Sequence, residues 1–184
     1  LDDTITFSQD CWNGLNYYND MNIGILDGEQ LTVNDALHAI LMSSANEVCN
    51  GAAKFVSGSV SAFCDLMNER AKTLGCTNTH FVNPNGLPNE EHYTSAYDLA
   101  MIGRAFFANE ALCKMTMTHM LHILPSERQP DDIMEVNKME LIPGGKYAYP
   151  YLVGCKTGYT DVAKAYILYR KQREKIRNMK STIL

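Results

Sequence analysis

The chain has 184 residues, of which 46% are hydrophobic and 20% are charged. This composition is typical of one globular domain with a hydrophobic core, and it excludes a disordered chain, a collagen-like repeat and a small disulfide-stapled protein. No run of about 18 apolar residues occurs, so the sequence predicts no membrane-spanning helix. The chain starts at Leu1 without a methionine or a signal-peptide pattern, and we interpret it as a piece that begins inside a longer protein.

Charge is divided unevenly along the chain. The formal net charge is -5, yet residues 164–184 contain seven Lys or Arg and one acid, Glu174, which leaves residues 1–163 strongly acidic. An acidic surface repels phosphate, so no nucleic-acid partner is expected. The six cysteines form no C-x-x-C pair and have no histidine at metal-ligand spacing. We therefore expect mostly buried, free thiols, and neither a metal site nor a cofactor.

The first expected elements are a short strand, a loop and a helix. Residues 4–7 alternate β-branched and aromatic side chains, which favours a strand, and residues 13–28 are rich in Asn, Gly and Asp, which favours a loop. Thr32 followed by Asp35 resembles a helix-capping pair, and apolar residues at helical spacing continue to Leu41. The sequence therefore predicts a helix that begins at Thr32.

Three further helices are expected before residue 120. The apolar pattern breaks at residues 43–46 and then restarts, so this segment is predicted to join two helices. Another helix is expected from Ser59 or Ser61 to Gly75, and one more from a cap at residues 94–95 through Phe106. These elements predict a helical subdomain over residues 32–120.

The last part of the chain has a different pattern. Residues 147–160 are rich in Tyr, Val and Thr, which favours a strand in a hairpin. Residues 164–184 are basic and contain neither Gly nor Pro, which favours an amphipathic helix. We therefore divide the chain into residues 1–163 and a helix-like tail, residues 164–184, of uncertain origin. One hypothesis is that the tail is out-of-frame or recombined sequence.

Two short motifs carry the candidate chemistry. Ser44-Ala45-Asn46 lies at the predicted helix junction, and Lys156-Thr157-Gly158 lies on the predicted strand. Both belong to the S-x-x-K, S-x-N and K-T-G set of penicillin-interacting serine enzymes. Each has a structural alternative, because Ser and Asn favour helix caps and Lys is common on exposed edge strands. The surrounding sequence favours the functional interpretation.

Longer segments around these motifs resemble the D-alanyl-D-alanine carboxypeptidases, the low-molecular-mass penicillin-binding proteins that trim peptidoglycan stem peptides. The resemblance is carried by residues 31–55, 63–87, 92–106 and 153–163, in the order and spacing of the family, and it covers about residues 1–163. It implies an α/β fold of the serine β-lactamase and penicillin-binding-protein type, with a helical subdomain beside an antiparallel sheet. We expect the sheet to be incomplete, because the family assembles it from both chain ends.

The resemblance implies a catalytic role for three residues. Ser44 is similar to the second serine of the family, whose hydroxyl relays a proton to the leaving D-alanine. Asn46 is similar to the amide that binds the substrate backbone and orients the catalytic lysine. Lys156 is similar to the lysine that supplies positive charge near Ser44 and the substrate carboxylate.

Three further residues are implied to bind substrate. Thr157 would offer its hydroxyl to the substrate carboxylate. Gly158, without a side chain, would let the strand approach a peptide closely. Tyr159 lies where the family strand contributes a backbone N–H to the oxyanion hole. The implied chemistry is formation and hydrolysis of an acyl-enzyme.

The nucleophile of that chemistry is missing from the sequence. No serine is followed by a lysine at the third position, so the S-x-x-K motif is absent. We therefore expect a fragment, truncated at both ends, that is inactive alone. The alternatives are a class A β-lactamase-like hydrolase, whose Glu-bearing loop has no clear match, and a non-enzymatic gene remnant or cell-wall peptide-binding fragment. By resemblance, the partners are peptidoglycan stem peptides and β-lactam antibiotics, met outside the cytoplasmic membrane.

Overall fold

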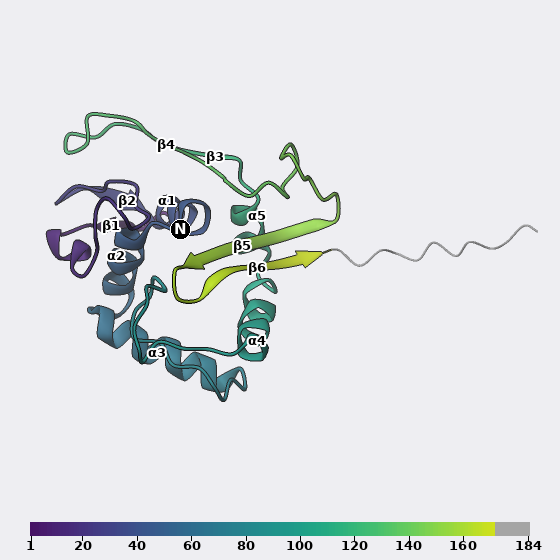
Figure 1. Cartoon of the computed structure of the whole chain (residues 1–184). Helices are drawn as coiled ribbons and strands as arrows, with labels where there is room; N and C mark the ends of the chain where they lie inside the picture. Colours follow the sequence, from purple (N-terminus) through teal and green to yellow (C-terminus); the bar gives the residue numbers. More distant parts are fainter. Residues whose placement is uncertain (172–184) are drawn as a thin grey trace, which may run out of the picture.

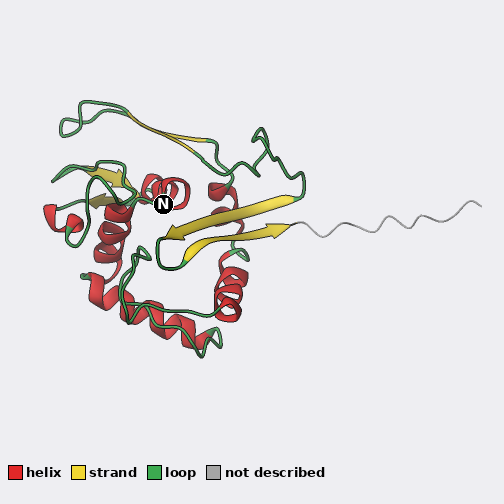
Figure 2. Cartoon of the chain, in the orientation of Figure 1, coloured by secondary structure: helices red, strands yellow, loops and turns green. Residues whose placement is uncertain are grey.

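This computed structural model describes residues 1–171, in which a run of helices is followed by four strands. In chain order the elements are β1 (Thr4–Thr6), the 3-10 helix η1 (Gln9–Trp12), β2 (Gln30–Thr32), α1 (Val33–His38), the π-helical turn η2 (Ala39–Ser43), α2 (Asn46–Ser57), α3 (Val60–Thr73), α4 (Ala96–Phe106), α5 (Glu110–Thr116), β3 (Met120–Ile123), β4 (Ile133–Val136), β5 (Leu152–Thr160) and β6 (Lys164–Lys171). The strands pair as three separate antiparallel ladders, β1–β2, β3–β4 and β5–β6. Figure 2 shows this mixture of helices and small sheets, which confirms the predicted α/β class with an incomplete antiparallel sheet.

In Figure 1 the β5–β6 hairpin crosses the view between α5 above and α4 below. Its closed end points toward α1, α2 and the β1–β2 pair. Helix α5 contacts β5 and helix α4 contacts β6. The β3–β4 hairpin runs along the top of the view and contacts η2 through β4. This arrangement brings β5 and the bend after η2 into the same region.

The main hydrophobic core lies around β1, β2, α1 and α2. Its most buried members include Phe7, Ile25, Leu31, Ala39 and Val48. A second, smaller cluster under β5 contains Ile142, Leu152 and Cys155. Over its 14 residues, by contrast, α3 buries only Cys64 and Ala71. Hydrophobic stabilisation is therefore concentrated on the α1–α2 side of the molecule.

Helix starts follow the capping signals in the sequence. Thr32, Ser59 and Ser95 each accept, through the side-chain oxygen, a hydrogen bond from the backbone N–H three residues later, at 3.0–3.1 Å. Such a bond satisfies one of the backbone donors that a helix start leaves free. The predicted helix starts at Thr32 and at residues 59 and 95 are confirmed, as is the junction at residues 43–46.

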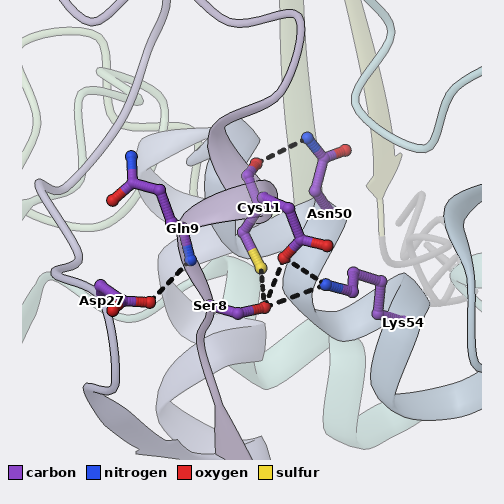
Figure 3. A network of polar contacts seen from close by, with 7 residues as sticks. Ser8, Gln9, Cys11, Asp27, Asn50 and Lys54 are labelled. Carbon is purple, nitrogen blue, oxygen red and sulfur yellow. Dashed lines mark hydrogen bonds and ion pairs between the residues drawn. The ribbon is translucent and has the colours of Figure 1, made fainter.

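Helix α2 is tied to η1 by a polar network (Figure 3). Asn50 Nδ2 donates to the backbone oxygen of Cys11 at 2.8 Å, and Lys54 Nζ donates to Ser8 Oγ at 2.9 Å and pairs with Asp10. These contacts fix the orientation of α2 and hence of its first residue, which follows the bend at the candidate site.

The segment after residue 163 corrects one prediction. The sequence predicts a basic helix over residues 164–184, but residues 164–171 form β6, which pairs with β5 from Thr160↔Lys164 to Leu152↔Lys171. The run Tyr166-Ile167-Leu168-Tyr169 has high β propensity, and pairing with a neighbouring strand outweighs the absence of Gly and Pro. The rest of the predicted helix lies outside the described residues, and the division at residue 163 stays a prediction.

Two other expectations in this half of the chain change. The strand predicted over residues 147–160 begins only at Leu152, and the β3–β4 hairpin was not predicted, because strands of four residues give too short a pattern. All six cysteines are free thiols, with Cys49 half-buried and the others buried, as expected. Within residues 1–171, no helix is long and apolar enough to cross a membrane.

Candidate active site

Ser44 stands at a sharp bend between η2 and α2. The wide turn of η2 lets the backbone N–H of Ser44 donate to the carbonyl of Ala39. Ser44 itself has φ 57° and ψ 39°, the left-handed region that a non-glycine residue rarely adopts. Such a conformation costs on the order of 1–3 kcal/mol and persists only where the surrounding structure enforces it, which is most often at a functional site. The bend turns the chain sharply at Ser44, just before α2 begins.

Lys156 reaches Ser44 from the middle of β5. Its Nζ donates to Ser44 Oγ at 2.5 Å and to the backbone oxygen of Thr157 at 2.7 Å. The two side chains are 112 residues apart in the sequence, so only the tertiary fold can bring them together. The structure thus joins the S-x-N motif and the K-T-G motif in one site.

Lys156 is partly buried beside two thiols, those of Cys49 and Cys155. Burial lowers the pKa of Lys156 below its ordinary value, and the two cysteines would oppose this shift only as charged thiolates. Burial in turn raises the pKa of Cys49 to about 12 and that of Cys155 to about 11, so both thiols are neutral near pH 7. Among residues 1–171, no carboxylate forms an ion pair with Lys156. A partly buried ammonium without a counter-ion favours binding of an anion such as a carboxylate.

Asn46 is buried and is hydrogen-bonded away from this pair. Its backbone N–H and its Nδ2 both donate to the carbonyl of Met21, at 2.9 and 2.8 Å. The next residue, Glu47, accepts a hydrogen bond from the N–H of Ile23 at 2.8 Å. These contacts fix the start of α2 to the loop before β2. Over the described residues, no hydrogen bond joins Asn46 to Ser44 or Lys156, and its substrate role stays a prediction.

The substrate-binding residues expected on β5 follow directly after Lys156. Thr157 and Tyr159 are exposed, and the Tyr159 hydroxyl donates to Asp161 Oδ1 at 3.0 Å, a contact that raises the pKa of Tyr159. For Gly158, the structure gives a steric reason for the absence of a side chain. A Cβ there would overlap the side chain of Tyr166, its partner on β6, so a larger residue would force Tyr166 to move even without a ligand.

The sequence did not single out two residues beside the bend. Ser43 is buried, and its Oγ donates to Glu135 Oε2 on β4 at 2.8 Å, across 92 residues of sequence. A lone glutamate in a four-residue strand carries no pattern that marks it as the partner of a serine. Only the pairing of β3 with β4 and the packing of β4 against η2 bring it there.

The site can bind an anion and pass a proton between Ser44 and Lys156. A hydroxyl in hydrogen-bond contact with an ammonium is a recognised arrangement for proton relay. Covalent catalysis also needs a nucleophile activated by a base, and the sequence holds no S-x-x-K motif to supply one.

The chain is similar in sequence to curated D-alanyl-D-alanine carboxypeptidases. The D-alanyl-D-alanine carboxypeptidase DacF of Bacillus subtilis (strain 168) is 40% identical over 137 residues, which are 74% of this chain and 34% of that protein. DacB2 of Mycobacterium tuberculosis is 34% identical over 147 residues, 77% of this chain and 47% of that protein. The chain thus spans between a third and a half of the length of these relatives.

Solved structures agree in fold. The D-alanyl-D-alanine carboxypeptidase of M. tuberculosis H37Rv superposes with a TM-score of 0.79 at 27% identity, covering 95% of this chain and 62% of that one. The Streptomyces K15 DD-transpeptidase has a TM-score of 0.83 at 21% identity, over 95% of this chain and 68% of that one, and supports the fold alone. The curated relatives and the M. tuberculosis carboxypeptidase structure favour the carboxypeptidase interpretation over that of a class A β-lactamase.

The family model described as D-alanyl-D-alanine carboxypeptidase matches residues 1–183. The match includes residues 164–183, whose origin the sequence leaves open. Together with the Ser44–Lys156 pair on the shared fold, it shows that the chain belongs to the D-alanyl-D-alanine carboxypeptidase family, peptidase family S11.

Proposed function

We propose that this chain supplies the carboxylate-binding and proton-relay part of a serine-type D-Ala-D-Ala carboxypeptidase, which removes the terminal D-alanine from peptidoglycan stem peptides outside the cytoplasmic membrane. The observation that carries the proposal is the hydrogen bond of 2.5 Å between Lys156 Nζ and Ser44 Oγ. Family membership supports the reaction class, since serine enzymes with the S-x-N and K-T-G motifs act on acyl-D-alanine groups or on β-lactams.

Substrate recognition would use the free end of the peptide. The terminal carboxylate is an anion, and Lys156 is an ammonium without a carboxylate partner among the described residues. Thr157, exposed on the next position of β5, can add a hydroxyl donor to the same group. β-Lactam antibiotics carry a carboxylate as well, so the same two residues would hold them.

The chemical steps divide between this chain and an S-x-x-K motif that its sequence does not contain. In a polypeptide with that motif, the motif's lysine accepts the proton of the serine hydroxyl as the serine oxygen attacks the carbonyl carbon. The bond to the D-alanine nitrogen then breaks, the Ser44 hydroxyl gives its proton to the leaving amine, and Ser44 takes up in its place, through Lys156, the proton that the serine lost. The backbone N–H of Tyr159 stabilises the oxyanion that forms on the carbonyl. Water then hydrolyses the acyl ester and frees the shortened peptide.

A fluorescent penicillin tests this division of labour. Only a protein with an activated nucleophile keeps the drug as a covalent adduct, so the 184-residue chain should show no label after denaturing electrophoresis. B. subtilis DacF serves as the positive control, and DacF quenched with unlabelled penicillin serves as the negative one. A stable label on this chain would overturn the assignment of the nucleophile to a missing motif.

A further inference from the structure

We infer that Glu135, on the β3–β4 hairpin, is a positioning residue that holds Ser44 in its left-handed conformation by acting through Ser43. The consequence would be that the Ser44 hydroxyl stays within reach of Lys156. The importance of this contact for peptide hydrolysis rests on the proposed function, whereas the contact itself is a property of the fold.

One hydrogen bond and one peptide bond connect Glu135 to Ser44. Ser43 is the last residue of η2 and directly precedes Ser44, and it is only 2% exposed. Its Oγ donates to Glu135 Oε2 at 2.8 Å. At 2.8 Å this hydrogen bond has the distance typical of a hydroxyl donor. Whatever fixes the Ser43 side chain therefore also limits the backbone rotation at Ser44.

Few other hydrogen bonds hold the bend in place, although Ala45 also packs in the main core. On its far side, Asn46 is fixed by two hydrogen bonds to Met21. Within residues 43–45, the backbone N–H groups of Ser44 and Ala45 donate only to Ala39 of the adjoining turn. The carbonyl of Ala45 accepts the first helical hydrogen bond of α2, from the N–H of Cys49 at 3.1 Å. Among the described residues, the hydrogen bond to Glu135 and the Lys156 contact are the side-chain hydrogen bonds that tie residues 43–45 to another element.

The position of Glu135 in the hairpin supports this role. Glu135 pairs directly with Leu121 on β3, and cross-strand partners point to the same face of an antiparallel pair. Leu121 is buried in the main core, so Glu135 takes a core-facing position. A carboxylate on such a face is unfavourable unless it is hydrogen-bonded, and Ser43 supplies that bond.

The test measures Lys156 in the 184-residue chain, without substrate. Competitive acetylation at micromolar protein, read by peptide mass spectrometry over a pH series, gives the pKa of Lys156. Ser44→Ala removes the contact entirely and so measures the largest effect that its loss can have. This variant should lower the pKa of Lys156, because the charged amine loses a hydrogen-bond acceptor. Glu135→Ala and Ser43→Ala should each lower the pKa of Lys156 by most of that amount. The double variant should lower this pKa no further than either single variant does, since both substitutions remove the same hydrogen bond.

Two further variants separate positioning from folding. Glu135→Gln keeps an acceptor oxygen for Ser43, so the pKa of Lys156 in this variant should be close to that in the unchanged chain, even if Glu135→Ala loosens the hairpin. Glu127 is an exposed carboxylate in the loop of the same hairpin, and Glu127→Gln should leave the pKa of Lys156 unchanged. The inference is overturned if Ser44→Ala lowers the pKa and neither Glu135→Ala nor Ser43→Ala does, if their effects add, or if Ser44→Ala itself has no effect. No substrate is present, so a failure of the proposed function cannot imitate these outcomes.

Discussion

Gly158→Ala separates two reasons for a glycine in the K-T-G motif. The resemblance to the family suggests that the glycine lets a peptide approach β5 closely. In the structure, a methyl carbon at this position would lie less than 3.0 Å from three atoms of the Tyr166 side chain on β6, two in the ring and the hydroxyl oxygen. We therefore expect the substitution to weaken the β5–β6 pairing before any ligand is added.

The size of the effect follows from how far Tyr166 can move. Forcing an extra methyl group into a packed contact costs about 1–3 kcal/mol. Tyr166 is 46% exposed, so its ring can turn partly toward solvent, which places the expected cost toward the lower end. A loss of about 1–3 kcal/mol corresponds to a roughly 5- to 150-fold fall in the protection of backbone amides against hydrogen exchange.

Hydrogen exchange followed by mass spectrometry measures this protection in peptides that cover β5 and β6. Tyr166→Ala in the Gly158→Ala background should restore most of the protection, because it removes the overlapping ring. Gly103→Ala is a matched control, since a Cβ there would meet Leu168 at an ordinary 3.5 Å. If Gly158→Ala leaves exchange unchanged and lowers only peptide binding, the overlap argument is wrong and the ligand requires the glycine.

Three further predictions concern stability. Burial raises the pKa of Glu47 above its ordinary 4.5, so its contribution to stability is fully present below about pH 4.5 and is lost as pH rises through the folded-state pKa. Glu47→Gln should therefore lose less unfolding free energy between acid and neutral pH in urea titrations, and an unchanged slope would contradict this. Gly51→Ala should lower the free energy of unfolding by about 1–3 kcal/mol in the same titrations, because the added methyl group would overlap the buried ring of Phe7. An unchanged free energy of unfolding would refute that packing. Because α3 buries so few side chains, the isolated chain should aggregate on heating, and a reversible, cooperative calorimetric transition of a monomer would count against this.

Local signals in the sequence were sufficient to predict the helix starts. Thr32, Ser59 and Ser95 are caps whose hydrogen bonds span three residues, so each can be read without knowledge of the fold. The bend at Ser44 was predicted as a junction for the same reason. Its left-handed conformation was not, because Ser44 adopts it only under constraints from the surrounding structure.

Contacts between distant segments account for what the sequence could not predict. β6 is a local exception: only residues 161–163 separate it from its partner β5, but these residues include no Gly, Asn or Pro that would have indicated a hairpin turn. The hydrogen bond between Ser43 and Glu135 crosses 92 residues. The Ser44–Lys156 contact crosses 112 residues, and it could be expected only because family resemblance stood in for the missing tertiary information.

The central claim is that Lys156, held against Ser44, binds the carboxylate of a peptide that ends in D-Ala-D-Ala. Titration calorimetry of such a peptide against the chain and its Lys156→Met variant tests it most directly, with the C-terminally amidated peptide as control. Loss of a hydrogen bond to a charged group costs about 1.5–3 kcal/mol, so Lys156→Met should weaken binding by roughly 10- to 150-fold. The amidated peptide should bind both chains weakly and equally. Equal affinity of both chains for the acid peptide, or no saturable binding by the unchanged chain, would contradict the account.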